Sequence, residues 1–208
     1  MVKTKGPAHS LEASGRLADV LIFSKSPNRN YVKKYAKPSN PKSVAQIAVR
    51  IMTGFLARDW RILSPAEKIT WTSRASKTKL ANYHAYVSAN ARRWNHFLTP
   101  SKEDPASGAG LRPQPNYLLL NPLISGVVVR CTIGSTHVPW GHIIYRSMFS
   151  GFTPSKATAV AVVHSEEPMP TYWTDTPLEP GTYYYRQQAF SPTGLIGNIS
   201  AEKVAVVA

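Results

Sequence analysis

The sequence predicts an α+β N-terminal domain, made of a β-hairpin and a small helical cluster, followed by an all-β sandwich. Three observations support this order. The helical spacing of apolar residues stops by Leu98, a segment rich in Pro, Gly and Ser follows, and each later apolar run is short and ends at a Pro or Gly turn. We therefore expect a hairpin-plus-helices domain over 1–98, a linker over 99–115 and a sandwich over 116–208.

The first predicted element is a hairpin. Residues 17–23 and 31–36 are rich in β-forming side chains and flank a Ser-Pro-Asn-Arg-Asn turn. A two-stranded hairpin alone is only marginally stable in water. We therefore expect this one to lie on its own helices or on another subunit.

Two helix starts follow the hairpin. Ser43 with Gln46, and Ser64 with Glu67, have the spacing of a capping box, and Pro65 occupies the first turn, where its missing N–H costs nothing. Apolar residues recur at helical spacing after each start. These signals predict a helix from about residue 41 or 44 to 61, then two helices or one broken helix over 65–98, with the break near 76–79.

The C-terminal half has the pattern of short strands separated by Pro and Gly turns. The predicted strands cover 126–133, 142–149, 157–164, 171–174, 182–190 and 199–207. Strands this short, in fewer than about a hundred residues, favour a β-sandwich.

Positive charge is concentrated in the N-terminal half. The formal net charge is +14, and residues 1–104 hold 19 Lys and Arg against 6 Asp and Glu, while residues 105–208 hold 6 against 5. Whatever partner the positive charge attracts, we expect the N-terminal half to contact it.

The sequence offers little to a catalytic or cofactor-binding interpretation. Its six histidines lack metal-ligand spacing with a carboxylate or thiol, and no Gly-rich phosphate loop or Gly-x-Ser-x-Gly elbow is present. The single Cys131 lies in an apolar run, which favours a buried thiol in a reducing compartment. No apolar run has the length of a signal peptide core or membrane span. We expect no enzyme, no cofactor, no metal and no membrane contact.

The C-terminal half resembles a fibronectin type III domain over about residues 113–208. The resemblance rests on LEPGTYYYRQQAFSPTG, residues 178–194, with its Leu-x-Pro-Gly turn and tyrosine-led strand, and on the preceding TYWTDTPL. It implies that Tyr183 is the tyrosine corner, with its hydroxyl bonded to backbone a few residues upstream. The family's core tryptophan is missing from VVVRCTI, so Trp140 or Trp173 is expected to fill core space instead.

The N-terminal half resembles a family of small bacteriophage-encoded structural proteins, which often have an appended fibronectin type III or immunoglobulin-like domain. The matching segments are residues 15–20, 31–41, 60–71 and 82–90, together with Gln46 and Arg50. The resemblance implies a structural component of the virion, made in the host cytoplasm and placed in the head, connector or tail. It implies no enzymatic role.

The segment WRILSPAEKITW, residues 60–71, supports an alternative. It fits the end of the second helix and the start of the third helix of an HMG box, which bends DNA. Only one helix precedes Trp60, however, and a hairpin occupies the place of the first helix of the box. For Trp60 and Trp71 we favour core packing at a helix corner over base stacking, with Ser64 and Glu67 fixing the helix between them.

Basic residues of the N-terminal half form the predicted partner-binding surface. We select Lys33, Lys34, Lys37, Arg58, Arg61, Arg74, Lys77, Lys79, Arg92 and Arg93. We favour docking on acidic surfaces of other virion proteins, or on further copies of the chain in the particle, over a solvated face and over nucleic acid. The loops 139–141 and 191–197 of the sandwich are exposed candidates for ligand contact, although no motif names a ligand.

Overall fold

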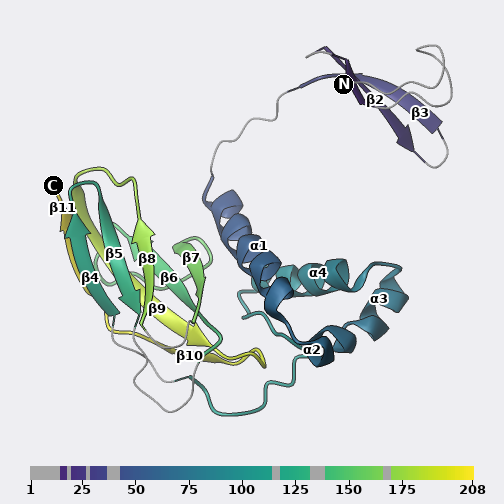
Figure 1. Ribbon diagram of the computed structural model, residues 1–208. Helices are drawn as coiled ribbons and strands as arrows, with labels where there is room; N and C mark the ends of the chain where they lie inside the picture. Colours follow the sequence, from purple (N-terminus) through teal and green to yellow (C-terminus); the bar gives the residue numbers. More distant parts are fainter. Residues whose placement is uncertain are drawn as a thin grey trace. The chain divides into compact units, whose positions relative to one another are not determined.

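The computed structural model describes residues 15–17, 20–26, 29–36, 43–113, 118–131, 139–165 and 170–208 (Figure 1). The chain divides into two compact units, Met1–Pro41 and Lys42–Ala208. Each unit is described by itself below.

The described residues of the N-terminal unit form one antiparallel sheet. Its strands are β1 (Gly15–Leu17), β2 (Leu21–Ser26) and β3 (Arg29–Lys34), in the order β1-β2-β3. The predicted hairpin corresponds to β2 and β3, with Phe23 opposite Val32. The short strand β1 adds a third member that the sequence did not predict.

The second unit begins with four helices. They are α1 (Val44–Ile62), α2 (Pro65–Thr70), α3 (Thr72–Thr78) and α4 (Asn82–Asn95). The predicted break near 76–79 is present, because Lys79 ends α3 in the left-handed region with φ 54°. A further break at Trp71 separates α2 from α3.

Among the described residues that follow, eight strands form two sheets. One sheet has the order β4-β5-β8, from β4 (Leu118–Leu123), β5 (Gly126–Cys131) and β8 (Thr171–Asp175). The other has the order β10-β9-β6-β7, with β11 also paired to β9. Its strands are β6 (Gly141–Ser147), β7 (Ala159–His164), β9 (Gly181–Phe190), β10 (Ile196–Ile199) and β11 (Lys203–Val207). The strands β4 and β10 were not predicted, and the last expected strand, over 199–207, begins only at Lys203 as β11.

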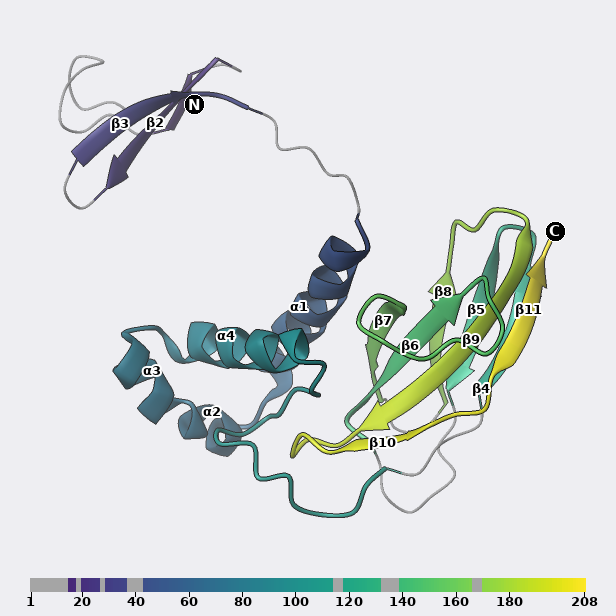
Figure 2. The ribbon, with the colours of Figure 1, turned by 180° about the vertical axis from the view of Figure 1, so that it is seen from behind.

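The sheets face each other as a fibronectin type III-like β-sandwich, which confirms the predicted fold class (Figures 1 and 2). Side chains of β9 alternate, so that Tyr183, Tyr185, Gln187 and Ala189 are buried between the sheets. The hydroxyl of Tyr183 donates a hydrogen bond to the carbonyl oxygen of Glu179 at 2.8 Å, the geometry of a tyrosine corner.

Replacing Tyr183 with phenylalanine should lower the free energy of unfolding by about 1 kcal/mol or more, because the corner hydrogen bond is lost from a buried site. Urea unfolding followed by fluorescence would measure the change. Tyr184→Phe is a matched control, since the Tyr184 hydroxyl makes no hydrogen bond to a described residue. Equal unfolding midpoints for the two variants would contradict the structural role of the corner.

The helices share a hydrophobic core with the sandwich, so the division of the chain differs from the predicted one at 98. Figure 2 shows the helices grouped at one side of the sandwich. The shared core contains Met52, Phe55 and Leu56 from α1, Tyr86 and Trp94 from α4, and Trp140, Ile143, Tyr145, Val162 and Phe190 from the sandwich. Trp140 therefore fills the space between the layers, while Trp173 packs, half-buried, against the core between the sheets.

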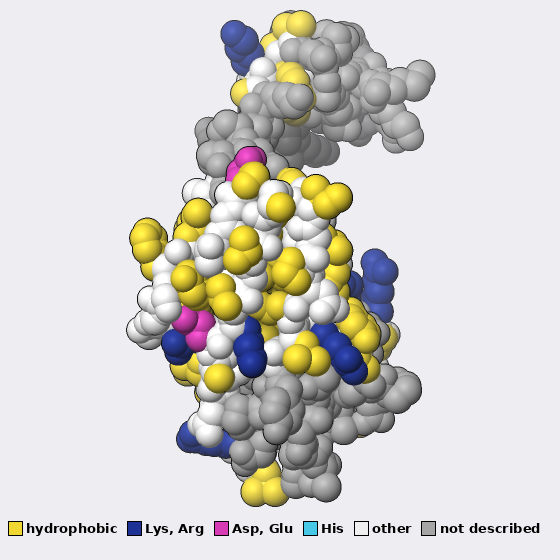
Figure 3. All heavy atoms as spheres, turned by 90° about the vertical axis from the view of Figure 1, so that its left-hand side faces the viewer, with side chains coloured by type: hydrophobic (Ala, Val, Ile, Leu, Met, Phe, Trp, Pro, Cys, Tyr) yellow, Lys and Arg dark blue, Asp and Glu magenta, His cyan; other side chains and the backbone are white. Residues whose placement is uncertain are grey.

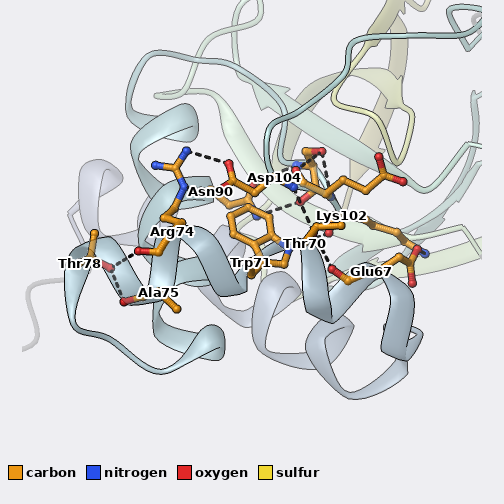
Figure 4. Close-up of polar contacts among 11 residues, drawn as sticks. Glu67, Thr70, Trp71, Arg74, Ala75, Thr78, Asn90, Lys102 and Asp104 are labelled. Carbon is orange, nitrogen blue, oxygen red and sulfur yellow. Dashed lines mark hydrogen bonds and ion pairs between the residues drawn. The ribbon is translucent and has the colours of Figure 1, made fainter.

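Residues 99–113 pack against the helices and the sandwich, and differ in this from the predicted linker. Nε1 of Trp71 donates to the Lys102 carbonyl oxygen at 2.8 Å, and Asn90 exchanges two hydrogen bonds with the backbone of Ser101 (Figure 4). On the other side, the Lys102 N–H donates to the Pro192 carbonyl oxygen at 2.9 Å. Side chains and loops elsewhere in the chain thus satisfy the backbone of this segment and fix it in place.

Candidate functional site

An aromatic cluster closes the corner between α1 and α2. Trp60 and Trp71 both contact Tyr86. Their ring centroids lie 5.4 Å and 5.2 Å, respectively, from the ring centroid of Tyr86. Ser64 and Glu67 form a complete capping box at the start of α2, with the Ser64 N–H 2.7 Å from Oε2 of Glu67. Because Trp71 is buried and lies edge-on to Tyr86, its ring is not available to stack on a base.

Asp59 connects the helices to the sandwich from a fully buried position. Its carboxylate accepts a hydrogen bond from the Tyr86 hydroxyl and another from Nε1 of Trp140, each at 2.8 Å. Nδ1 of His164 lies 3.9 Å from the same carboxylate. Burial raises the pKa of Asp59, although both donors favour the ionised form. Asp59 could not be identified from the sequence, because its partners Tyr86 and Trp140 lie 27 and 81 positions away along the chain.

Phe55 completes the junction beside Asp59. Its ring stacks on His164, with centroids 4.1 Å apart, and meets Trp140 and Phe190 edge-on. Aromatic contacts of this kind stabilise beyond the area that they bury. The helices and the sandwich are therefore joined through a packed aromatic and polar contact, and not by a flexible connection.

Two of the predicted partner-binding cations are used within the chain. The guanidinium of Arg74 makes two hydrogen bonds of 2.7 Å to the carboxylate of Asp104 (Figure 4). Nε of Arg93 donates to the Thr99 carbonyl oxygen at 2.7 Å, and burial lowers the pKa of Arg93. Arg74 and Arg93 therefore fix residues 99–104 against α3 and α4, and little of their charge is available to a partner.

The other selected cations are exposed on separate elements. Lys33 and Lys34 lie on β3, Arg58 and Arg61 on α1, Lys77 and Lys79 at the end of α3, and Arg92 on α4. Lys37 lies outside the described residues. These exposed cations remain candidates for partner contact, but they do not lie in one unit. Lys33 and Lys34 belong to the N-terminal unit, and the others belong to the second unit.

The loops expected to meet a ligand are largely covered. Trp140 is buried in the core shared with α1, and Thr99 Oγ1 donates to the Gly194 carbonyl oxygen at 2.8 Å. Oγ1 of Thr193 donates to the Ala109 carbonyl oxygen at 2.8 Å. The prediction of open loops at 139–141 and 191–197 is thus corrected, because the helices and residues 99–113 cover this end of the sandwich.

The side of the sandwich formed by β4 and β11 is exposed and apolar. Figure 3 views this side, where hydrophobic side chains are spread between few charged ones. On β11, Ala205 and Val207 are buried, so Val204 and Val206 face outward, and Ile124 beyond β4 is 88% exposed. Leu119 and Leu123 are exposed on the outer face of one sheet and Val204 and Val206 on the outer face of the other, and together with Ile124 we call them the apolar side. Exposed apolar patches frequently mark contact surfaces.

The described residues contain little that could support catalysis. Within them, no group of three or more His, Cys, Asp or Glu could hold a metal ion. Burial raises the pKa of the Cys131 thiol to about 12, which makes it a poor nucleophile. No helix in the described part of the chain is long and apolar enough to cross a membrane.

No family model matches the sequence, and no curated protein matches it. Solved structures are similar to about half of the chain. The FN1–FN3 domains of chicken CNTN1 are 18% identical over 47% of this chain and 32% of that chain, with a TM-score of 0.37. A Fn3-like protein from Clostridium thermocellum is 21% identical over 48% of this chain and 95% of that chain, with a TM-score of 0.36. A beta-1,2-glucanase from Parabacteroides distasonis is 19% identical over 48% of this chain and 13% of that chain, with a TM-score of 0.39.

Proposed function

We propose that this protein is a non-catalytic structural component of a bacteriophage virion, which docks on neighbouring virion proteins through its basic N-terminal unit and presents the sandwich. The observation that carries the proposal is the single-layered N-terminal sheet. The described residues of Met1–Pro41 form three strands and no helix, and Phe23 is the one buried apolar residue among their described side chains. A three-stranded sheet is stable by itself only when it has a hydrophobic face or packs against a helix, so a sheet with one buried apolar side chain described would gain stability from a second layer or further strands.

Another protein can supply what this sheet lacks. The outer strands β1 and β3 each have one edge without a partner strand among the described residues, and Val32 on β3 is exposed. Unpaired edges are templates for pairing with a second chain. Residues 1–41 hold eight Lys and Arg against two Asp and Glu, so an acidic partner surface is favoured. That partner is a neighbouring virion protein or a further copy of this chain.

The apolar side of the sandwich supports the same function. It gives the Lys42–Ala208 unit a second surface for contact, which suits a protein held between neighbours in a particle. Because the helices and the sandwich share a core, a partner that fixes one of them also fixes the other.

Analysis of purified particles tests the proposed function. The full chain should be detected by mass spectrometry in particles fractionated into heads and tails, and Lys33→Glu with Lys34→Glu should reduce its incorporation. Because the proposal assigns docking to the N-terminal sheet and not to the basic residues of the helices, Lys77→Glu with Lys79→Glu, the same charge change at the end of α3, should leave incorporation unchanged. Particles that lack the chain, or that incorporate the β3 variant normally, would refute the proposal.

A DNA-binding role is the second candidate. Arg58, Arg61, Lys77, Lys79 and Arg92 are exposed on the helices and make no ion pair with a described residue. If they contact phosphates, affinity for duplex DNA should fall by about 10³-fold or more between low and physiological salt. A gel retardation series over salt concentration would show this, and a weak, salt-insensitive signal would exclude the role.

A further inference from the structure

The helices cover only one end of the outer face of the sheet that contains β9. Ile143 on β6 packs against the helices and lies opposite Gln188 on β9. Four residues earlier on β9, Tyr184 is on the same face and lies opposite Val204. Val204 and Val206 on β11 are 56% and 62% exposed. Figure 2 shows this end of β11, beside the C-terminus, on the side of the sandwich away from the helices. The outer face is therefore covered at one end and apolar and exposed at the other.

The loop after β6 lies along this exposed end and presents two large apolar side chains. Met148 is 60% exposed and Phe149 is 80% exposed. Met148 borders the start of β9, because a Cβ atom on Gly181 would lie 3.8 Å from its Cε. Gly181 in turn pairs with Val207 at the end of β11. We call Met148 and Phe149 the knob.

A polar contact with the residue before β11 fixes the loop that carries the knob. The carboxylate of Glu202 accepts a hydrogen bond from the Ser150 hydroxyl at 2.8 Å and another from the Gly151 N–H at 2.9 Å. The guanidinium of Arg186 lies 3.4 Å from the same carboxylate. An apolar side chain that is held in place before binding loses less conformational freedom when a partner covers it. The knob is therefore preorganised for contact and lies beside the exposed valines of β11.

The sandwich is nearly neutral, unlike the first half of the chain. Residues 105–208 hold 6 Lys and Arg against 5 Asp and Glu, whereas residues 1–104 hold 19 against 6. Beside the knob, Arg186 and Glu202 form an ion pair with each other. Lys203 lies on the opposite face of β11 from Val204, because side chains of a strand alternate. A near-neutral apolar face fits a partner surface of the same character, and the sandwich of a second copy has that character.

We propose that this face is a dimer interface between two copies of the chain. Phe149 of each copy packs on Val204 and Val206 of the other. Because the knob and the valines lie side by side, one two-fold axis forms both contacts in a single interface. An aromatic side chain buries about 150 to 250 Å², so two knobs and four valines form the centre of an interface at the small end of the ordinary range, about 1,200 Å² in total.

Analytical ultracentrifugation of the full chain tests the proposal. The wild type should form a dimer with a dissociation constant on the order of 10 µM, as suits a small interface. Added salt should strengthen the dimer, because it screens the repulsion between the two positively charged N-terminal halves. Docking of the N-terminal sheet on an acidic surface would weaken with salt, so the sign of the salt effect distinguishes the two contacts.

Two variants on different elements show whether the interface is this face. Phe149→Glu should weaken the dimer by about tenfold or more, because it removes the aromatic ring and buries a charge without a partner. Val206→Lys should weaken it for the second of these reasons. Ile69→Glu is the matched control, since Ile69 is 70% exposed on α2, outside the face, and this change should leave the dimer unaffected. Circular dichroism would confirm that each variant is folded.

A mixture of the two variants tests the two-fold contact itself. The Phe149→Glu chain and the Val206→Lys chain should form a heterodimer more tightly than either forms a dimer alone. In the heterodimer the introduced carboxylate faces the introduced ammonium at one contact, and the other contact keeps the original Phe149 and Val206.

Three results would overturn the proposal. The first is a wild type that stays monomeric at concentrations up to about 1 mM, which would leave the face to a different protein. The second is a dimer that Phe149→Glu and Ile69→Glu affect equally. The third is a mixture that forms no more dimer than the separate variants. None of them bears on whether purified particles contain the chain, so this proposal and the proposed function fail separately.

Discussion

Replacing Asp59 with alanine is expected to lower the free energy of unfolding of the Lys42–Ala208 unit by about 3 to 5 kcal/mol. The Tyr86 hydroxyl and the Trp140 indole N–H both donate to Asp59 from buried positions, and each would lose its partner. A buried donor without a partner costs about 1 to 3 kcal/mol, and the space left by the carboxylate adds to this loss. Urea unfolding of the wild type and the variant at one pH would measure the difference.

Asp104→Ala is the matched control, because it also removes a carboxylate that pairs with another side chain. Arg74, the partner of Asp104, is 41% exposed at its side chain, so that loss should stay within about 1 kcal/mol. Tyr86→Phe completes a double-mutant cycle with Asp59→Ala, and the coupling should be about 1 kcal/mol or more. If Asp59→Ala unfolds at the same denaturant concentration as the wild type, the carboxylate does not stabilise the junction.

The same substitution should change how the helices and the sandwich unfold. In the wild type, the helix signal in far-UV circular dichroism and the tryptophan fluorescence should change together in one unfolding transition. The reason is that the helices and the sandwich share a core. With Asp59 removed, the contact between α1 and Trp140 weakens. The helix signal should then be lost at a lower denaturant concentration than the protection of the β6 and β9 amides from hydrogen exchange, which reports the sandwich.

Interactions between residues close in sequence could be predicted. Ser64 and Glu67 bond each other across three positions, and Tyr183 bonds backbone four positions upstream. The left-handed end of α3 at Lys79 falls inside the predicted break. In each case a few neighbouring residues determine the geometry, so the pattern can be read from one stretch of chain.

Interactions between distant residues could not be predicted. Asp59 and Trp140 are 81 positions apart, and Arg74 and Asp104 are 30 apart. No local sequence pattern links the members of either pair. In the sequence, Asp59 cannot be distinguished from the other polar residues of an amphipathic helix. The composition of residues 99–113 is typical of a linker, and only the side chains that bond its backbone reveal that it is packed.

Two strands show why apolar runs alone mislead. The sequence of β4 is LLLNPL, which contains a proline and no β-branched residue, and so is not typical of a strand. The expected last strand starts late, because the Gln187 N–H donates to the Ser200 hydroxyl at 2.9 Å in place of a backbone carbonyl, and regular pairing with β9 resumes only at Lys203. Pairing with β5 defines β4, and pairing with β9 sets the start of β11.

His142 should make the stability of the second unit sensitive to acid. It lies on β6 opposite Ala189, is fully buried, and neither ring nitrogen makes a hydrogen bond to a described residue. Burial lowers the pKa of His142 from 6.5 to about 4, because the charged imidazolium is poorly solvated there. Folding therefore keeps this side chain neutral over a range of pH in which the unfolded chain protonates it.

The sign of the effect follows from where each state binds the proton. Near neutral pH neither state is protonated at His142, so no stability is lost. As pH falls from 6.5 to about 4, the unfolded state binds the proton and the folded state does not, so stability decreases. The total loss is about 3 kcal/mol, since each pKa unit corresponds to about 1.4 kcal/mol. Below about pH 4 both states are protonated, and this contribution stays constant.

His142→Leu should remove this acid sensitivity. Leucine suits the position, because alternation along β6 places His142 on the same face as Ile144, in the core between the sheets. Urea unfolding from about pH 7 down to about pH 4 should show a smaller loss of stability in the variant than in the wild type. His96→Gln, at an exposed position, is the control and should keep the wild-type slope. Asp59, whose pKa is raised, contributes with the opposite sign in both proteins, so the comparison isolates His142. Parallel slopes for wild type and His142→Leu would mean that His142 is solvated or protonated in the folded chain.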